Sequence, residues 1–318
     1  MLIRVIISLS LIILLLYMMR GKYGQLLSVF RQTSLTVFWL GFLIFIAAVS
    51  VASIRMKMII EAQEIPVTFI EAISLTFIGY FFNNFLPTAI GGDMVKAYYL
   101  SKKTSNKIGA FASVFVDRLI GLLTMVFMAF VALLFVDNAA MDRTVRFMIY
   151  TITLIAAIIL LFMFNRRFAR MFSFLLFFLR PIEEKLRKAY GTINKYREHK
   201  ILMLQSFAIS IVSQALFFVS LAMIAVSIGK TIPMKELFLR MPIVSMLSLL
   251  PSINGLGLRE GATVVFIGPL IGKENAFAVS ILWLAILFIV SIIGGIVYAL
   301  SPQFKVKLKE VEEEGFGS

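Results

Sequence analysis

Several ionisable residues fall within or beside apolar stretches of the chain, where a charged side chain needs a partner, water or a ligand. The acids are Glu71, Asp93, Asp117 and Glu260, and the bases are Lys96, Arg118 and Arg259. A charge at the centre of a bilayer costs roughly 2.5–3.5 kcal/mol on insertion scales when it is neither paired nor hydrated. Guanidinium groups hold phosphate through two parallel hydrogen bonds. These residue types therefore favour either buried ion pairs or a site for an anionic phosphate.

Two of these charges follow a pair of glycines. Asp93 and Lys96 come directly after Gly91 and Gly92 and lie three positions apart, which places them on one face of a helix that starts at the glycines. Asp93 either caps that helix, because a carboxylate suits the free N–H groups and the positive dipole end, or belongs to a ligand site. Both interpretations are open at this point.

Two amides precede this helix start, and two charges follow it deeper in the next helix. Asn83 and Asn84 either satisfy backbone carbonyls where the helix unwinds or bind a polar lipid headgroup. Asp117-Arg118 lies about 12–15 Å into its helix at 1.5 Å per residue. For this pair an ion pair with Lys96 or Asp93 is favoured slightly over direct contact with a ligand.

The second half of the chain has a comparable cluster, formed by Asn254, Gly255 and Gly257 and then by Arg259 and Glu260. Adjacent residues of a helix point to different faces, so we expect Arg259 and Glu260 not to pair with each other. Helix N-termini that point toward the membrane centre present free N–H groups to an anion. Together the two clusters predict a polar cavity that suits phosphate.

Composition limits the kind of protein that can carry these sites. Of the 318 residues 60% are hydrophobic, so lipid must be the solvent for much of the surface. The net charge is +14, but Lys and Arg lie between the apolar stretches, as in cytoplasmic loops of membrane proteins, which argues against a nucleic-acid partner. Cysteine is absent and His199 is the only histidine, so we predict no metal, no cofactor and no catalytic residue. The 31 Phe and 17 Met are interpreted as lipid-facing or core residues.

Six stretches are long and apolar enough to cross a bilayer, which takes about 20 residues. They are Leu2 to Met19, Leu35 to Ile54, Ile108 to Val136, Val145 to Phe164, Ile201 to Ile228 and Asn275 to Leu300. Two more are apolar but interrupted. Val67 to Leu86 breaks at Pro87, and Leu237 to Leu250 breaks at Pro251, each with a short helical piece beyond the break. We interpret both as re-entrant hairpins.

The two breaks resemble each other, since Leu-Pro and a hydroxyl residue begin both and an Ala-Phe-Ala triplet opens the next long helix in both. The sequence therefore predicts an all-α, polytopic membrane protein with about six crossings and two broken-helix hairpins. Its halves, about 1–140 and 141–304, each hold three crossings, so they enter the membrane in opposite senses as an inverted repeat. Residues 1–304 form one transmembrane domain, and 305–318 form a charged tail.

Loop charges predict the orientation. Most Lys and Arg residues fall in loops that lie on one side if both termini are in the cytoplasm, above all in the basic loop 165–200. We expect that loop to contact anionic lipid headgroups at the cytoplasmic membrane. A regulatory or partner-docking role, with a cytoplasmic enzyme as the partner, is an equal alternative to a solvated connector. Nothing in the sequence indicates an oligomeric state.

At these residues the chain resembles a known family. Gly79 to Pro87, Gly91-Gly92-Asp93, Tyr98-Tyr99-Leu100, Ser113 to Arg118 and Gly121 resemble the membrane domain of lysylphosphatidylglycerol synthases, and Asn254 to Gly261 matches the second signature of that family. The resemblance implies a flippase-like domain, as in bacterial multiple peptide resistance factors, where it moves an aminoacylated phospholipid between leaflets. Aminoacyl transfer in those proteins belongs to a separate soluble domain. We expect no such domain here, because few residues follow the last predicted helix.

Three functions remain in view. The leading hypothesis is a transporter that moves a phospholipid or lipid-linked anionic headgroup by alternating access. The second is a membrane enzyme that uses Asp93, Asp117 or Glu260 as an acid or base on a lipid phosphate. The third is an accessory subunit that docks a lipid-modifying enzyme or glycosyltransferase through loop 165–200.

Overall fold

A computed structural model describes residues 23–85, 91–135, 142–164, 191–192, 196, 198–250, 252, 255–301 and 304. The predicted first crossing, both break prolines Pro87 and Pro251, the amide of Asn254, most of loop 165–200 and the tail 305–318 lie outside these residues. In chain order the described helices are α2 (Tyr23–Arg31), α3 (Leu35–Glu61), α4 (Phe69–Phe85), α5 (Gly91–Lys102), α6 (Lys107–Leu133), α7 (Arg143–Phe164), α10 (Lys200–Ser227), α11 (Met234–Leu247), α12 (Leu258–Ile271) and α13 (Lys273–Leu300). No strand occurs in the described part of the chain.

Long apolar helices confirm the predicted membrane class. Within the described residues, five helices are long and apolar enough to cross a bilayer, namely α3, α6, α7, α10 and α13. All five were predicted crossings. The end predicted for α3 is wrong, because the helix continues past Ile54 to Glu61 and thereby includes Arg55 and Lys57. Those two cations belong to a helix, not to a loop.

Both interrupted segments are broken helices, as predicted. α4 ends at Phe85 and α5 starts at Gly91, while α11 ends at Leu247 and α12 starts at Leu258. In the second break Gly255 and Gly257 have φ of +75° and +84°, a backbone conformation that favours glycine. The glycines therefore allow the chain to reverse between α11 and α12, within a largely buried setting.

The two halves repeat each other in element order. α3, α4, α5 and α6 start at residues 35, 69, 91 and 107, and α10, α11, α12 and α13 start at 200, 234, 258 and 273. Each start in the second half thus follows its counterpart by 165 to 167 residues. This near-constant separation over four elements confirms the internal repeat.

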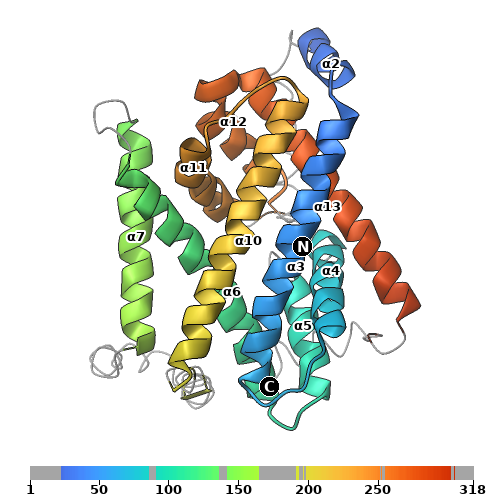
Figure 1. Cartoon of the computed structure of the whole chain (residues 1–318), viewed down its shortest axis with the longest axis vertical. Coiled ribbons are helices and arrows are strands. Elements are labelled where there is room, and N and C mark those ends of the chain that lie inside the picture. The colour runs from blue at the N-terminus through green and yellow to red at the C-terminus, as the bar shows by residue number, and fades with distance from the viewer. Residues whose placement is uncertain are drawn as a thin grey trace.

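Contacts between α3 and α10 show that the repeat is inverted. The start of α3 meets the end of α10, because the Ser34 amide donates to the Ser227 carbonyl at 2.7 Å. Farther along, the Ser220 hydroxyl donates to the Gly41 carbonyl at 2.7 Å and the Ser213 hydroxyl to the Ala48 carbonyl at 2.9 Å. The equivalent helices therefore run antiparallel, and the two hairpins lie toward opposite ends of the molecule (Figure 1).

Each hairpin also packs against a long helix of the other half. α4 packs along α13, and α11 packs against α6. At the first of these contacts the backbone of α4 approaches Gly294 so closely that a Cβ there would overlap the Phe77 carbonyl. These contacts hold each hairpin against the last helix of the other half of the repeat.

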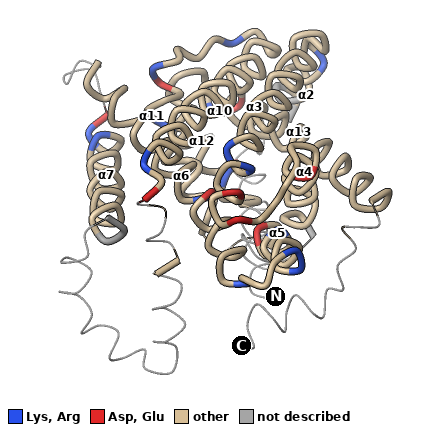
Figure 2. Tube along the Cα trace, turned by 60° about the horizontal axis from the view of Figure 1, so that its bottom comes forward, with Lys and Arg blue, Asp and Glu red and all other residues tan. Residues whose placement is uncertain are grey.

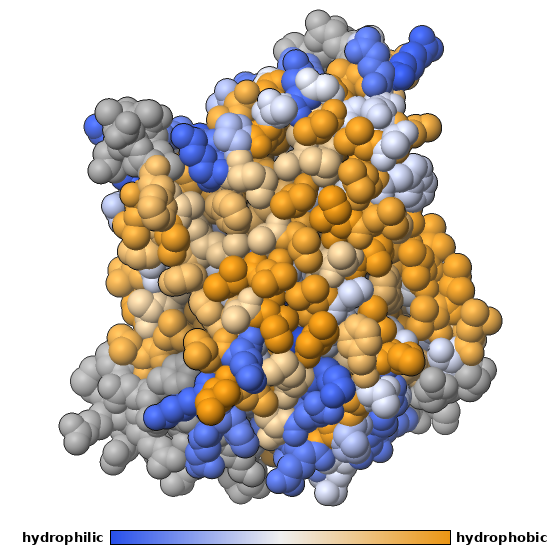
Figure 3. Space-filling view, viewed as in Figure 1, coloured by the Kyte–Doolittle hydropathy of each residue, from blue (hydrophilic) through white to orange (hydrophobic). Residues whose placement is uncertain are grey.

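The surface has the pattern that a bilayer requires. On the face shown in Figure 3, orange apolar side chains form a broad band across the middle of the molecule, and blue polar side chains gather at its two ends. The charged residues of the helices likewise lie mostly near helix ends (Figure 2). Exposed large apolar residues such as Leu43, Phe147 and Leu154 belong to crossing helices. An apolar band of this kind is stable only in lipid.

Candidate functional site

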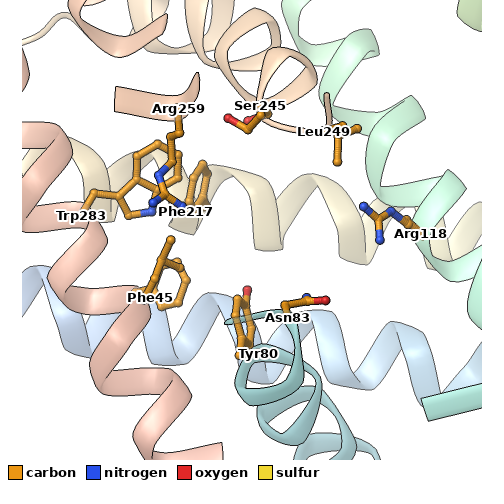
Figure 4. A pocket seen from close by; sticks show the side chains of 11 residues that line it. Phe45, Tyr80, Asn83, Arg118, Phe217, Ser245, Leu249, Arg259 and Trp283 are labelled. Carbon is orange, nitrogen blue, oxygen red and sulfur yellow. The ribbon is translucent and has the colours of Figure 1, made fainter. Parts of the chain in front are cut away.

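A cavity of about 300 Å³ lies between the two broken hairpins. Its lining comes from α4, α11 and α12 of the hairpins and from the long helices α3, α6, α10 and α13 (Figure 4). The lining residues are Phe45, Tyr80, Asn83, Arg118, Phe217, Ser245, Ser248, Leu249, Arg259, Trp283 and Leu287. Both halves of the repeat thus contribute to one site near the middle of the fold.

Two guanidinium groups line this cavity from opposite sides. Arg118 reaches it from α6, and Arg259 reaches it from the first turn of α12 (Figure 4). The Arg259 side chain is only 5% exposed, whereas the Arg118 side chain is 28% exposed. Two guanidinium groups that line one cavity suit an anionic ligand.

Aromatic rings form a continuous wall on one side of the cavity. The ring centroid of Phe45 lies 6.1 Å from Tyr80 and 6.1 Å from Phe217, and Phe217 lies 5.5 Å from Trp283. The Arg259 guanidinium stacks over Trp283 at 5.2 Å from the ring centroid. Sequence reasoning missed this wall, because the four rings come from four helices and no local motif joins them.

A compact ion cluster lies at the start of α5, beside the first break. Asp93 accepts from Lys96 Nζ at 3.2 Å and pairs with Arg118 through its other carboxylate oxygen. The Gly92 backbone N–H donates to the Asn83 side-chain oxygen at 2.8 Å, so the Asn83 side chain caps the start of α5. The predicted proximity of Asp93 and Lys96 is confirmed. Asp93 was also one of the two partners predicted for Asp117-Arg118, and it pairs with Arg118.

Asp117 has a different partner from the ones predicted. Its carboxylate pairs with Arg55 Nε at 2.8 Å, and the Arg55 guanidinium also donates to the Ser210 hydroxyl at 2.7 Å. Neighbouring positions of a helix diverge by about 100°, so Asp117 faces α3 and α10 while Arg118 faces the hairpin. Arg55 was not considered, because the sequence placed it beyond the end of its helix. The Arg55–Asp117 pair joins three helices and does not line the cavity.

The prediction that Arg259 and Glu260 do not pair is wrong. Arg259 donates to one Glu260 oxygen from Nε at 3.1 Å and from Nη2 at 2.8 Å. The other oxygen accepts from the Gly257 amide at 2.6 Å. That hydrogen bond turns the carboxylate back over the start of α12, where the long arginine side chain can reach it. Both side chains are almost completely buried, so the pair neutralises both charges locally.

Glu71 lies away from the cavity. It accepts from Lys103 Nζ at 2.6 Å and from the Thr68 amide at 2.9 Å, at the start of α4. The residue caps its helix and ties α4 to the segment that follows α5. It takes no part in the candidate site.

Comparison with known proteins agrees with this architecture. Residues 1–295 match the family described as the lysylphosphatidylglycerol synthase TM region. The chain belongs to this family. A UPF0104 membrane protein of Pyrococcus horikoshii is 26% identical over 330 aligned residues, which cover 92% of this chain and 94% of the relative. No solved structure is significantly similar.

In this member of the lysylphosphatidylglycerol synthase TM-region family, the structure separates the predicted site residues into groups. Asn83, Arg118 and Arg259 line the cavity. A second group does not line the cavity but pairs with the lining residues or forms the adjacent turns and helix starts. It comprises Gly91, Gly92, Asp93, Lys96, Gly255, Gly257 and Glu260. Asn84 is not among the lining residues, and Asp117 belongs to the separate pair with Arg55. The site is thus smaller than predicted and includes aromatic residues that no motif indicated.

Proposed function

We propose that this chain moves a phospholipid or a lipid-linked anionic headgroup across the cytoplasmic membrane by alternating access. The observation that carries the proposal is the cavity between the two inverted hairpins, with Arg118 on one side and Arg259 on the other. An anion that leaves water needs donors to replace its hydration, and two guanidinium groups supply them. The surrounding aromatic and aliphatic wall suits the lipid part of such a substrate.

The inverted repeat supplies a physical basis for transport. Two hairpins of opposite orientation enclose one site, so rocking of one against the other would open the site to one leaflet at a time. We propose that both termini face the cytoplasm, because this places the basic loop 165–200 there.

The contacts of the buried acids favour transport over catalysis by the same cavity. Asp93 is shared by Lys96 and Arg118, and Glu260 is held by Arg259 and a backbone amide. Both oxygens of each carboxylate therefore already accept from protein donors. These groups therefore suit charge balance better than proton transfer to a lipid phosphate.

A flipping assay tests the proposal. Purified protein is placed in phosphatidylcholine liposomes that carry a fluorescent phosphatidylglycerol, and dithionite quenches the label in the outer leaflet. We expect protein-containing liposomes to lose the inner-leaflet signal much faster than empty ones. Ser245→Trp, which fills the cavity, should abolish this gain, whereas Val265→Trp on the exposed face of α12 should retain it. Equal rates with and without protein, or equal effects of the two variants, would contradict the proposal.

A further inference from the structure

The charges that line the cavity are all of one sign. Its described lining residues include Arg118 and Arg259 and contain neither Asp nor Glu. The adjoining break segments, residues 86–90 and 251–254, contain no acid in the sequence either. The nearby carboxylates of Asp93 and Glu260 lie behind the arginines and already accept hydrogen bonds from cations or amides. A positively charged headgroup would therefore find no carboxylate to pair with.

The aromatic wall offers little compensation to a cation. Trp283 is the ring best suited to hold an ammonium group, because tryptophan gives the strongest cation–π interaction. The Arg259 guanidinium already covers that ring, 5.2 Å from its centroid. An ammonium group placed in the cavity would meet a covered ring and two guanidinium groups, whose partner carboxylates already accept hydrogen bonds and are not among the described lining residues.

Trp283 also has a buried donor that no described residue satisfies. Its side chain is nearly buried, with the residue 6% exposed, and its indole nitrogen has no hydrogen-bond partner among the described residues. A buried donor without an acceptor is unfavourable, so such groups are commonly completed by a ligand or water. Trp283 and Arg259 both line the cavity, so an acceptor that enters it and reaches the indole nitrogen would complete this donor.

We infer that the cavity binds lipids whose headgroup is an unmodified anionic phosphate and rejects lipids whose phosphate is neutralised by an attached amine. The Trp283 indole N–H donates to the phosphate together with the guanidinium groups of Arg118 and Arg259. The inference rests on the proposed function, since it concerns the selectivity of the same site. It separates this chain from the aminoacylated lipid in the name of its family.

Trp283 makes the test possible, because the chain has only two tryptophans. Trp39 lies outside the cavity and is 48% exposed, so Trp39→Phe leaves Trp283 as the single reporter. The variant is placed in phosphatidylcholine nanodiscs that contain increasing fractions of phosphatidylglycerol, of a polyprenyl monophosphate or of lysylphosphatidylglycerol. Phosphatidylglycerol presents its phosphate as a diester and the polyprenyl monophosphate presents it as a monoester, so comparing these two lipids shows which form of the phosphate the cavity binds.

We expect at least one anionic lipid to shift Trp283 emission at a mole fraction about tenfold or more below that needed for lysylphosphatidylglycerol. Half-saturation by lysylphosphatidylglycerol at an equal or lower fraction would overturn the inference. A lack of response to both anionic lipids would overturn it as well.

A designed change in the wall provides a second test. Leu249 lines the cavity and is 39% exposed, so a glutamate there can remain partly hydrated. Leu249→Glu should improve binding of lysylphosphatidylglycerol relative to phosphatidylglycerol about tenfold over the isosteric control Leu249→Gln. An unchanged ratio would mean that cavity charge does not set the selectivity.

The two proposals fail in different ways. If the Trp283 signal prefers the anionic lipids but reconstituted protein flips neither lipid, the selectivity stands and the transport proposal is wrong. If the protein flips lysylphosphatidylglycerol as fast as phosphatidylglycerol, transport stands and the selectivity is wrong.

Discussion

Among the described residues, each buried charge has an identifiable counter-charge, but the pairs differ in how exposed they are. The Arg55–Asp117 pair is well buried, with side chains 9% and 13% exposed, and it bridges α3 and α6. The Asp93–Arg118 pair lies beside the cavity, where Lys96 provides a second cation for the same carboxylate. The first arrangement is typical of a structural pair, and the second leaves an arginine able to share its charge with a ligand.

We predict that Arg118→Gln impairs transport more than folding. Lys96 still neutralises Asp93 in this variant, so no buried acid is left alone. Loss of one charge-assisted hydrogen bond to the phosphate should slow flipping about tenfold or more. The measurements are folded yield in detergent and the flipping rate in liposomes.

The double variant Arg118→Gln with Asp93→Asn distinguishes the two roles of Arg118. If the arginine contacts the lipid, the double variant folds well and still fails to transport. Recovery of both yield and transport would show that Arg118 only balances Asp93, and the assignment of the site would then be wrong.

The opposite result is expected at the structural pair. Arg55→Met leaves Asp117 buried without its cation, which should cost about 3–5 kcal/mol and lower the thermal midpoint of the detergent-solubilised protein. Arg55→Met with Asp117→Leu should recover most of that loss, because both charges are removed together. A thermal midpoint as low for the double variant as for Arg55→Met alone would contradict the structural role.

The sequence predicted the lining residues better than their partners. Asn83 and Arg259 were recognisable as polar groups beside helix breaks, and Arg118 as a charge deep within an apolar helix. Pairing depends on where a long side chain folds back. The Arg259–Glu260 pair forms only because a hydrogen bond to Gly257 redirects the carboxylate, and spacing along the helix contains no such information.

Among the elements, the second hairpin depends on glycines whose conformation other residues resist. Gly257 has φ of +84° and its amide donates to Glu260, so it fixes both the turn and the position of the Arg259–Glu260 pair. Gly229 has φ of +71° in the connection after α10, with open space where a Cβ would lie. The two glycines share a backbone requirement and differ in their distance from the site.

We predict that Gly257→Leu disables transport more than it lowers expression. A leucine in the left-handed region costs on the order of 1–3 kcal/mol, and here that strain displaces a site element. Gly229→Leu carries a similar backbone strain away from the cavity and serves as the matched control. Flipping rates normalised to folded protein provide the measurement, and equal rates for the two variants would show that the break is not a tight site.

The elements themselves were largely predictable. Apolar length gave the crossings, and the two Leu-Pro breaks gave the hairpins and the repeat. The end of α3 was not predicted, because Arg55 and Lys57 look like loop residues until the partners that neutralise them, Asp117 and Glu61, are known. One ion pair between helices and one within α3 thus accompany a helix that continues beyond the end that local hydropathy predicted.

At the scale of the whole molecule, the apolar band and its two polar ends define a direction across the membrane. The α5–α6 connection lies at the same end of the molecule as the chain segments on either side of loop 165–200, and the α10–α11 connection lies at the opposite end (Figure 1). The large excess of Lys and Arg in loop 165–200 predicts, under the positive-inside rule, that this end faces the cytoplasm.

Single cysteines test this orientation cleanly, because the chain has none of its own. Ser105 lies in the α5–α6 connection and Thr231 in the α10–α11 connection, and both are exposed. We predict that a membrane-impermeant maleimide labels Thr231→Cys in intact cells and labels Ser105→Cys only after the membrane is opened. The positively charged loop would otherwise have to cross the bilayer against the membrane potential, which costs about 2.3 kcal/mol per charge at 100 mV. Labelling of Ser105→Cys in intact cells, with Thr231→Cys protected, would reverse the orientation and would place the first hairpin toward the outer leaflet.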